Sequence, residues 1–150
     1  MRLTKKLMFA IEAVLDIAYH AADMPVQSKD IAERQGIPRR YLEQVLQQLV
    51  RADVLRGVRG PRGGYRLARE RRNISVADIV KVVQTMDGGM DPLVDPTGSE
   101  LGHAVLRPLW QEIEDAAMAH LSKTSVEDLC AKAEQAGIES VHRANFDFII

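Results

Sequence analysis

The stretch that decides the fold lies at residues 28–68 and reads SKDIAERQGIPRRYLEQVLQQLVRADVLRGVRGPRGGYRLA. We expect Ser28 to cap a short helix that Gly36 ends, because glycine adopts the left-handed conformation without strain. A second helix is expected from Pro38, since proline fits the first helical position, and apolar residues then recur every three or four positions up to residue 52. Two helices joined by about three residues that include a glycine predict a helix-turn-helix.

Two further runs follow, VLRGVR at 54–59 and YRLA at 65–68, and they flank the loop GPRGG at 60–64. Both runs alternate in part between apolar and polar residues, which predicts a two-stranded hairpin whose loop needs glycine torsions. A helix-turn-helix followed by such a hairpin is a winged helix. The predicted fold class is therefore mainly α with a small β wing.

Helical segments flank this module on both sides. Residues 4–22 predict an amphipathic helix with Thr4 as its N-cap. Ser75 and Asp78 form a capping box that opens another helix. Together these elements predict a winged helix-turn-helix DNA-binding domain at residues 1–86.

The C-terminal half is predicted to begin with an acidic loop rich in proline and glycine at residues 87–99. Thr97 and Glu100 then form a capping box for a long helix, in which Pro108 is expected to cause a kink or to reset the start. Such a helix would run about 35 Å at 1.5 Å per residue. Because a helix of this length in a small chain usually packs on a partner, we expect its apolar stripe to form a dimer interface. The predicted dimerisation residues are Leu101, Val105, Leu109, Ile113 and Ala117.

A last helix is predicted to open at Thr124 with Glu127 and to end near Gly137. The apolar tail NFDFII follows at residues 145–150. With the long helix, these elements make up a predicted C-terminal region at residues 100–150.

Charge is distributed unevenly along the chain, although the net charge is only −1. Residues 1–72 hold 15 Lys and Arg against 8 Asp and Glu, a net charge of +7, while residues 73–150 hold 5 against 13, a net charge of −8. Between residues 34 and 72 there are 11 arginines and no lysine. A solvated surface is one interpretation, but arginine concentrated on a helix-turn-helix and a wing favours contacts with phosphates and base edges.

The candidate DNA contacts lie on the second helix of the helix-turn-helix and on the wing. Opposite the apolar stripe, that helix carries the residue types that read a major groove: arginine binds guanine, glutamine binds adenine and glutamate accepts from the cytosine amino group. An arginine on a narrow loop can enter a minor groove, where negative potential is concentrated. The predicted DNA-binding residues are Ser28, Arg39, Arg40, Tyr41, Glu43, Gln44, Gln47, Arg59, Gly60, Pro61, Arg62 and Gly63.

Several motifs resemble one family of bacterial regulators. The opening MRLTKK, the segment YLEQVLQQL at 41–49 and above all VRGPRGGYRLA at 58–68 resemble the Rrf2 family of winged-helix transcription regulators, the group of IscR-like and NsrR-like proteins. The match is dense over residues 1–86 and looser beyond. The resemblance implies a homodimer crossed through the long helix, recognition helices in adjacent major grooves, and a minor-groove contact by Arg59.

One departure from that family concerns the cofactor. Cluster-binding members carry three cysteines in the loop that matches residues 87–100, and this loop has none. The single cysteine, Cys130, lies on the predicted last helix, where it is expected to be buried packing, and His103 lies seven residues before Trp110, farther than in cluster-binding members. Thiolates are the usual ligands of iron-sulfur clusters. We therefore expect no cofactor and no bound metal.

Composition excludes other classes of protein. With 46% apolar and 27% charged residues, the chain is typical of globular proteins rather than disordered or fibrous ones. Glu12, Asp16 and His20 interrupt the N-terminal apolar stretch at helical spacing, so neither a signal peptide nor a transmembrane span is expected. One cysteine suits a reducing cytoplasm. No glycine-rich phosphate loop or catalytic triad pattern is present in the sequence, so we do not expect an enzyme.

We interpret the chain as a cytoplasmic, homodimeric transcription regulator, a repressor, that recognises an inverted-repeat operator in double-stranded DNA. Two alternatives stay open. One is a thiol or metal sensor that uses Cys130 or His103. The other is a protein-interaction module whose acidic C-terminal half binds a partner, with DNA binding incidental. The sequence does not name a small-molecule or protein effector.

Overall fold

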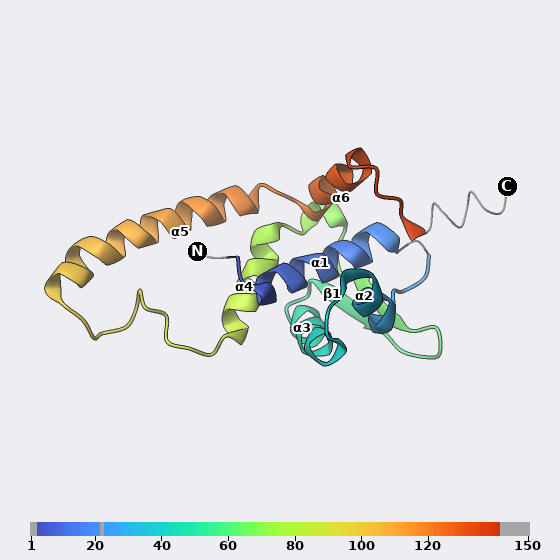
Figure 1. Cartoon of the computed structure of the whole chain (residues 1–150), viewed down its shortest axis with the longest axis horizontal. Helices are drawn as coiled ribbons and strands as arrows, with labels where there is room; N and C mark the ends of the chain where they lie inside the picture. The colour runs from blue at the N-terminus through green and yellow to red at the C-terminus, as the bar shows by residue number, and fades with distance from the viewer. Residues whose placement is uncertain (1–2, 22, 142–150) are drawn as a thin grey trace.

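The structure is a computed structural model, and it describes residues 3–21 and 23–141. Helices dominate, and one two-stranded antiparallel sheet forms the wing, as the sequence predicted (Figure 1). In chain order the elements are α1 Lys5–His20, α2 Ser28–Gln35, α3 Arg39–Arg51, β1 Leu55–Val58, β2 Gly64–Leu67, η1 Arg71–Asn73, α4 Val76–Met86, η2 Gly102–Leu106, α5 Arg107–Ser122 and α6 Val126–Gln135.

The central helix α1 crosses the middle of the molecule, with α2, α3 and α4 packed around it (Figure 1). The hydroxyl of Thr4 accepts a hydrogen bond from the Leu7 N–H at 3.2 Å, which confirms the predicted N-cap. Side chains of Ala10, Val14 and Ile17 on α1 are fully buried. They meet the buried stripe of α3 and the inner face of α4 in one continuous core.

The turn between α2 and α3 follows the prediction at its centre and differs at its edges. Gly36 has φ 64° and ends α2 in the left-handed conformation, as expected. Ser28 is wrong as the N-cap, because Gln27 holds that position and no side chain caps the helix. Pro38 is the N-cap of α3, so that helix begins one residue later than predicted, at Arg39.

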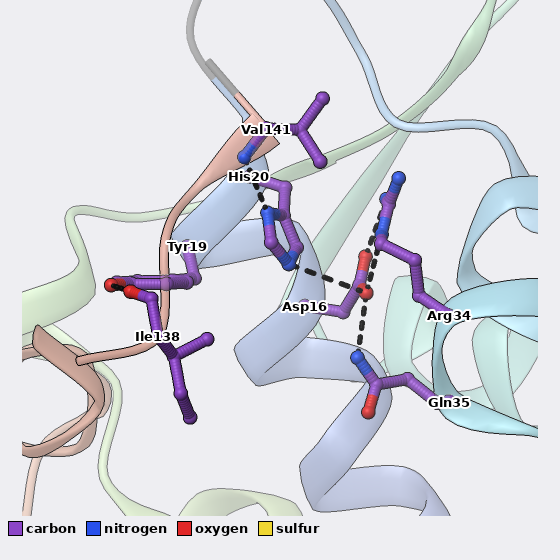
Figure 2. A network of polar contacts seen from close by, with 7 residues as sticks. All are labelled: Asp16, Tyr19, His20, Arg34, Gln35, Ile138 and Val141. Atoms are coloured by element: carbon purple, nitrogen blue, oxygen red, sulfur yellow. Dashed lines mark hydrogen bonds and ion pairs between the residues drawn. The ribbon is translucent and has the colours of Figure 1, made fainter. Parts of the chain in front are cut away.

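A buried carboxylate fixes α2 on α1 (Figure 2). The side chain of Asp16 on α1 is fully buried and receives two hydrogen bonds from Arg34, at 2.8 and 2.9 Å, and one from Gln35 at 2.8 Å. Both donors lie in the last turn of α2. Because an unpaired charge is costly in a protein interior, this network sets the position of α2 against the body.

The same end of α1 holds the segment that follows α6. His20 accepts a hydrogen bond from the Val141 N–H through Nδ1 at 3.0 Å, and the Tyr19 hydroxyl donates to the Ile138 carbonyl (Figure 2). Burial is the main cause that lowers the pKa of His20, and a neutral ring is the form in which Nδ1 can accept.

The start of the long helix differs from the predicted capping box. The hydroxyl of Ser99, not that of Thr97, accepts from a helical N–H, at 3.1 Å from Gly102, while the Thr97 hydroxyl donates to the Asp95 carboxylate. A wider helical turn, η2, then precedes α5, which resets at Arg107. Pro108 explains the reset, since it has no N–H to donate and its ring crowds the preceding turn.

The last helix also begins one residue later than predicted. Ser125 and Asp128 form its capping box, with bonds of 3.0 and 2.9 Å, so the pair Thr124 and Glu127 is wrong. Strand-like hydrogen bonds join this corner to the start of α4, and α6 contributes Val126 and Cys130 to the core. The predicted division of the chain before residue 100 stays a prediction. Helix α6 lies beyond that division and nevertheless shares the core of the N-terminal module. The apolar tail at 145–150 lies outside the described residues.

Candidate nucleic-acid interface

Helix α3 exposes one polar face and buries the other. Leu42, Val45, Leu46 and Leu49 are at most 1% exposed and anchor the helix in the core. On the opposite side the predicted reading residues are all exposed: Arg39, Arg40, Glu43, Gln44 and Gln47. The structure thus brings these five side chains together on one solvent-facing surface, which we call the α3 face.

One ion pair lies on the α3 face. Arg39 Nε lies 3.4 Å from Glu43 Oε1, and the two side chains are 64% and 49% exposed. An exposed pair at this spacing contributes only about 0.3–0.5 kcal/mol to the helix. It is therefore easily exchanged for contacts with a ligand. Arg40 has no ion pair among the described residues.

The wing pairs Leu55 with Leu67 and Val58 with Gly64 in antiparallel register. Residue Tyr65 also exchanges two backbone hydrogen bonds with Val26, at 2.8 and 2.9 Å, which attaches the wing to the segment before α2. At Gly63 an added Cβ would lie 2.2 Å from the Val58 carbonyl oxygen, so only glycine fits there. These contacts fix the loop relative to the helix-turn-helix.

The tip of the wing carries the predicted loop residues. Arg59, Gly60, Pro61 and Arg62 are all exposed, and Gly63 is half-buried. Gly60 has φ 108°, and its carbonyl accepts from the Gly63 N–H at 2.9 Å, which closes a tight turn. Neither arginine of the tip has an ion pair among the described residues, so two cations project from a narrow loop.

The structure separates the arginines of residues 34–72 into two groups. Arg34, Arg39, Arg69, Arg71 and Arg72 pair with carboxylates, and Arg66 donates to the Asp23 carbonyl. Of these six, Arg34, Arg66, Arg69 and Arg71 connect different elements of the fold, whereas Arg39 and Arg72 pair with neighbours in the chain. Among the described residues, the other arginines of this range have no such internal contact: Arg40, Arg51, Arg56, Arg59 and Arg62.

Two of the predicted DNA contacts lie away from the α3 face and the wing tip. Tyr41 packs its ring edge-on against Phe9, with centroids 5.8 Å apart, and its hydroxyl is buried. Burial is the main cause that raises the pKa of this phenol. Ser28 is half-buried in the first turn of α2. Neither contributes to the two exposed surfaces described above.

Helix α5 and the helical turn η2 before it leave an apolar face uncovered. It extends from the body as an arm, and the loop 87–99 runs from the end of α4 to the far end of that arm (Figure 1). No described residue of α5 is buried. The exposed fractions of the predicted dimerisation residues fall from 76% at Leu101 to 62% at Val105, 52% at Leu109 and 44% at Ile113. Leu106 and Trp110, which we had not predicted, widen the same face.

Ala117 lies in a different setting from the other predicted dimerisation residues. It is half-buried and lines an apolar groove of about 470 Å³, together with Leu3, Leu7, Ile11, Val76, Val80, His120 and Leu121. Three helices, α1, α4 and α5, form the walls of this groove. The apolar groove therefore continues the uncovered face of α5 onto the body.

The fold and the two exposed surfaces define a winged-helix regulator that binds DNA. The chain belongs to the Rrf2 family, whose description reads "Iron-dependent Transcriptional regulator" and which matches residues 3–132. It is 38% identical over 141 residues to the HTH-type transcriptional regulator IscR of Photorhabdus laumondii, covering 89% of this chain and 82% of that protein. To Protein rrf2 of Nitratidesulfovibrio vulgaris it is 32% identical, covering 89% of each chain.

Solved structures agree with this assignment. T. potens IscR superposes with a TM-score of 0.73 at 30% identity, over 96% of both chains. CymR (YrzC), the global cysteine regulator of B. subtilis, superposes with a TM-score of 0.71 at 27% identity, over 88% of this chain and 98% of that one. These relatives are named as transcriptional regulators, and the chain is a regulator rather than an enzyme.

The iron in the family's description does not fit the donor atoms of this chain. The loop 87–99 contains no cysteine. Cys130 is 2% exposed within the core, and burial is the main cause that raises the pKa of its thiol, which disfavours the thiolate that iron requires. His103 faces Arg107, with Nδ1 2.8 Å from a guanidinium nitrogen. Within residues 3–21 and 23–141, no three His, Cys, Asp or Glu side chains gather as a metal site.

Arg107 holds the loop instead. Its guanidinium donates to the backbone carbonyls of Asp95 and Thr97. Hydrogen bonds from the Thr97 N–H and hydroxyl lower the pKa of Asp95. At the other end of the loop, Lys6 on α1 pairs with Asp87 at 3.0 Å, and that bond raises the pKa of Lys6. The part of the loop nearest α5 is thus fixed by Arg107, a residue of the chain itself.

No helix in the described residues is long and apolar enough to cross a membrane.

Proposed function

We propose that this chain is a cytoplasmic, homodimeric repressor that recognises an inverted-repeat operator without an iron-sulfur cluster. The observation that carries the proposal is the joint exposure of the α3 face and the wing tip on one core. Both surfaces present cations that the protein does not use internally. Sequence-specific recognition needs base contacts as well as phosphate contacts, and the α3 face holds both kinds of side chain.

We assign the reading of bases to the α3 face. Arg40 is free to bind guanine bidentately, while Glu43 can accept from a cytosine amino group once its pair with Arg39 opens. Gln44 and Gln47 lie on the same exposed side of the helix and supply amide donors and acceptors. Arg59 and Arg62 on the thin wing tip supply contacts to the backbone or to a narrow minor groove.

We assign dimerisation to the uncovered face of α5. Contiguous exposed apolar surface on a folded chain marks an interaction site, and here it runs over about three turns from Leu101 to Ile113. The apolar groove beside Ala117 continues this face and has walls suited to the apolar end of a second α5. In a twofold dimer each arm would use the same residues, which is the isologous arrangement common in small regulators.

The two sensor alternatives receive less support from the geometry. A redox-sensing thiol needs an exposed, acidified cysteine, whereas Cys130 is buried and its pKa is raised. A metal site at His103 competes with the guanidinium of Arg107 for Nδ1. We therefore propose that any signal reaches this protein through a small molecule or a protein partner.

Salt dependence of DNA binding tests the proposal. If a dimer contacts about eight phosphates, the slope of log K against log salt should be about −7, because each contact releases condensed counterions. Fluorescence anisotropy with a labelled genomic duplex between 50 and 200 mM salt, about the range over which such contacts weaken, measures this slope. A flat dependence would contradict the DNA-binding role.

A further inference from the structure

A cavity lies behind the recognition helix, outside the α3 face and the wing tip. It has a volume of about 430 Å³, within the usual range for sites that bind small molecules. The end of α3, the residues between α3 and β1, Arg69 after β2 and one side of α4 form its walls. Val54 and Val82 are buried apolar residues that line it. We call this cavity the α3–α4 pocket.

The α3–α4 pocket is electropositive. Its charged lining residues are Arg51 from α3, Arg69 after β2, and Lys81 and Asp78 from α4. Three cations against one carboxylate leave a net charge of +2. Arg69 is already engaged, since it donates to the carbonyls of Asp53 and Asn73 and lies 3.7 Å from the Asp78 carboxylate.

The other two cations are available to a ligand. Arg51 and Lys81 are exposed, and neither has an ion pair among the described residues. They come from two different helices, α3 and α4, that both line the pocket. Gln48 adds an amide donor from α3, while the hydroxyl of Thr85 donates to the Val82 carbonyl at 2.7 Å and so can only accept from a ligand.

We propose that the α3–α4 pocket binds a small dianion, a dicarboxylate or a phosphate monoester with a short hydrocarbon body. Arg51 binds one anionic group with its planar fork, and Lys81 binds the same or a second group as a point charge. The hydrocarbon part rests on Val54 and Val82. An anion gains charge-assisted contacts with Arg51 and Lys81 that a neutral or cationic ligand cannot make, so the charge of the lining favours an anion.

Binding here would connect two elements that the proposed function uses. An anion between Arg51 and Lys81 joins the end of the recognition helix to α4. Helix α4 leads at Met86 into the loop 87–99 and from there to α5. Occupancy would therefore bias the position of α3 relative to the arm, which in a dimer sets the distance between the two recognition helices. This effect rests on the proposed function, whereas binding itself does not.

Inorganic phosphate, titrated into the ¹⁵N-labelled full chain without DNA, tests the proposal. We expect saturable amide shifts around Arg51, Lys81 and Thr85, with chloride at equal ionic strength giving none. Lys81→Glu should weaken phosphate binding at least about tenfold, because it removes a charge-assisted contact and adds repulsion. Lys123→Glu makes the same charge change at an exposed position directly after α5 and should leave phosphate binding unchanged.

Three results would overturn the proposal: shifts that rise linearly without saturation, shifts centred on the wing tip, or unchanged affinity in Lys81→Glu. Addition of a DNA duplex separates a second source of phosphate. If the duplex displaces phosphate from Arg51 and Lys81, these residues contact the DNA backbone, and the proposal that the pocket binds a small dianion is wrong. If the wild type binds phosphate but no DNA, the proposed function fails while the α3–α4 pocket stands.

Discussion

Helices α1 and α5 have the same length, 16 residues, but differ in how much of each helix is buried. Helix α1 buries six residues, including Ala10, Val14 and Ile17, while no residue of α5 is buried. Both carry apolar side chains at helical spacing. The difference is therefore not in the local pattern but in what the chain supplies to cover it, since α1 is surrounded by four other helices and most of α5 extends beyond the body (Figure 1).

The comparison shows which part of the molecule is complete within one chain. The body of α1 to α4 with α6 has a continuous core and an internally paired charge network. The arm presents Leu106, Leu109 and Ile113 to solvent, at an energetic cost of about 25 cal/mol for each Å² of apolar surface that a partner would cover. We therefore expect the body to determine the stability of the fold and the arm to determine assembly.

The largest effect is expected when the arm receives a charge. Ile113→Asp should raise the dimer dissociation constant at least about a hundredfold, because an isolated carboxylate would have to lose its water in the interface. Analytical ultracentrifugation measures the association. Gln111→Asp, an equal charge change at an exposed polar position of α5, is the matched control and should stay dimeric. A folded, tightly associated Ile113→Asp protein would show that the interface lies elsewhere.

A smaller effect is expected when the body loses an internal charge. Arg34→Ala leaves the buried Asp16 carboxylate without its main partner and should lower the free energy of unfolding by about 3 kcal/mol, measured by urea denaturation. Arg72→Ala removes an arginine whose pair with Glu70 is about two thirds exposed on both sides, and should cost less than about 0.5 kcal/mol. Equal losses in the two variants would contradict the claim that the buried pair with Asp16 stabilises the body more than an exposed pair does.

The reading surface should show the smallest effects on stability and a distinct pattern in binding. Arg40→Ala should relax sequence preference by about 1–3 kcal/mol at one base pair of each half-site, whereas Arg59→Ala should weaken binding mainly where the flanks are A/T-rich. Binding to a set of single-base operator variants separates these outcomes. If both variants lose affinity equally on every sequence, the two arginines contact only phosphate.

At the start of α4, local rules predicted the cap correctly, although a capping box predicted in the same way at Thr97 and Glu100 was wrong. Ser75 with Asp78 fitted a single capping box, and the structure contains it. At the last helix two candidate boxes overlap by one residue, Thr124 with Glu127 and Ser125 with Asp128. The choice is fixed by distant backbone, because the Val126 N–H donates to the Ile74 carbonyl at 2.8 Å. Such a contact between segments far apart in the chain cannot be read from local sequence.

The candidate site was predictable as a face but not as a set of contacts. Helical periodicity places Arg39, Arg40 and Glu43 opposite the buried stripe, and they are indeed exposed. Composition could not tell that Arg34 pairs with a carboxylate 18 residues away, or that the Tyr41 hydroxyl is buried. Eleven arginines suggested one basic surface, and tertiary contacts divide them between internal pairs and free cations.

Selection of genomic DNA fragments by the purified full chain tests whether the protein binds operator DNA as an α5 dimer. Two recognition helices related by the twofold axis of an α5 dimer should select inverted repeats whose half-sites lie one DNA turn, about 34–36 Å, or a multiple of it apart. We expect such repeats in the enriched pool. Enrichment of single half-sites, direct repeats or unrelated fragments would contradict it.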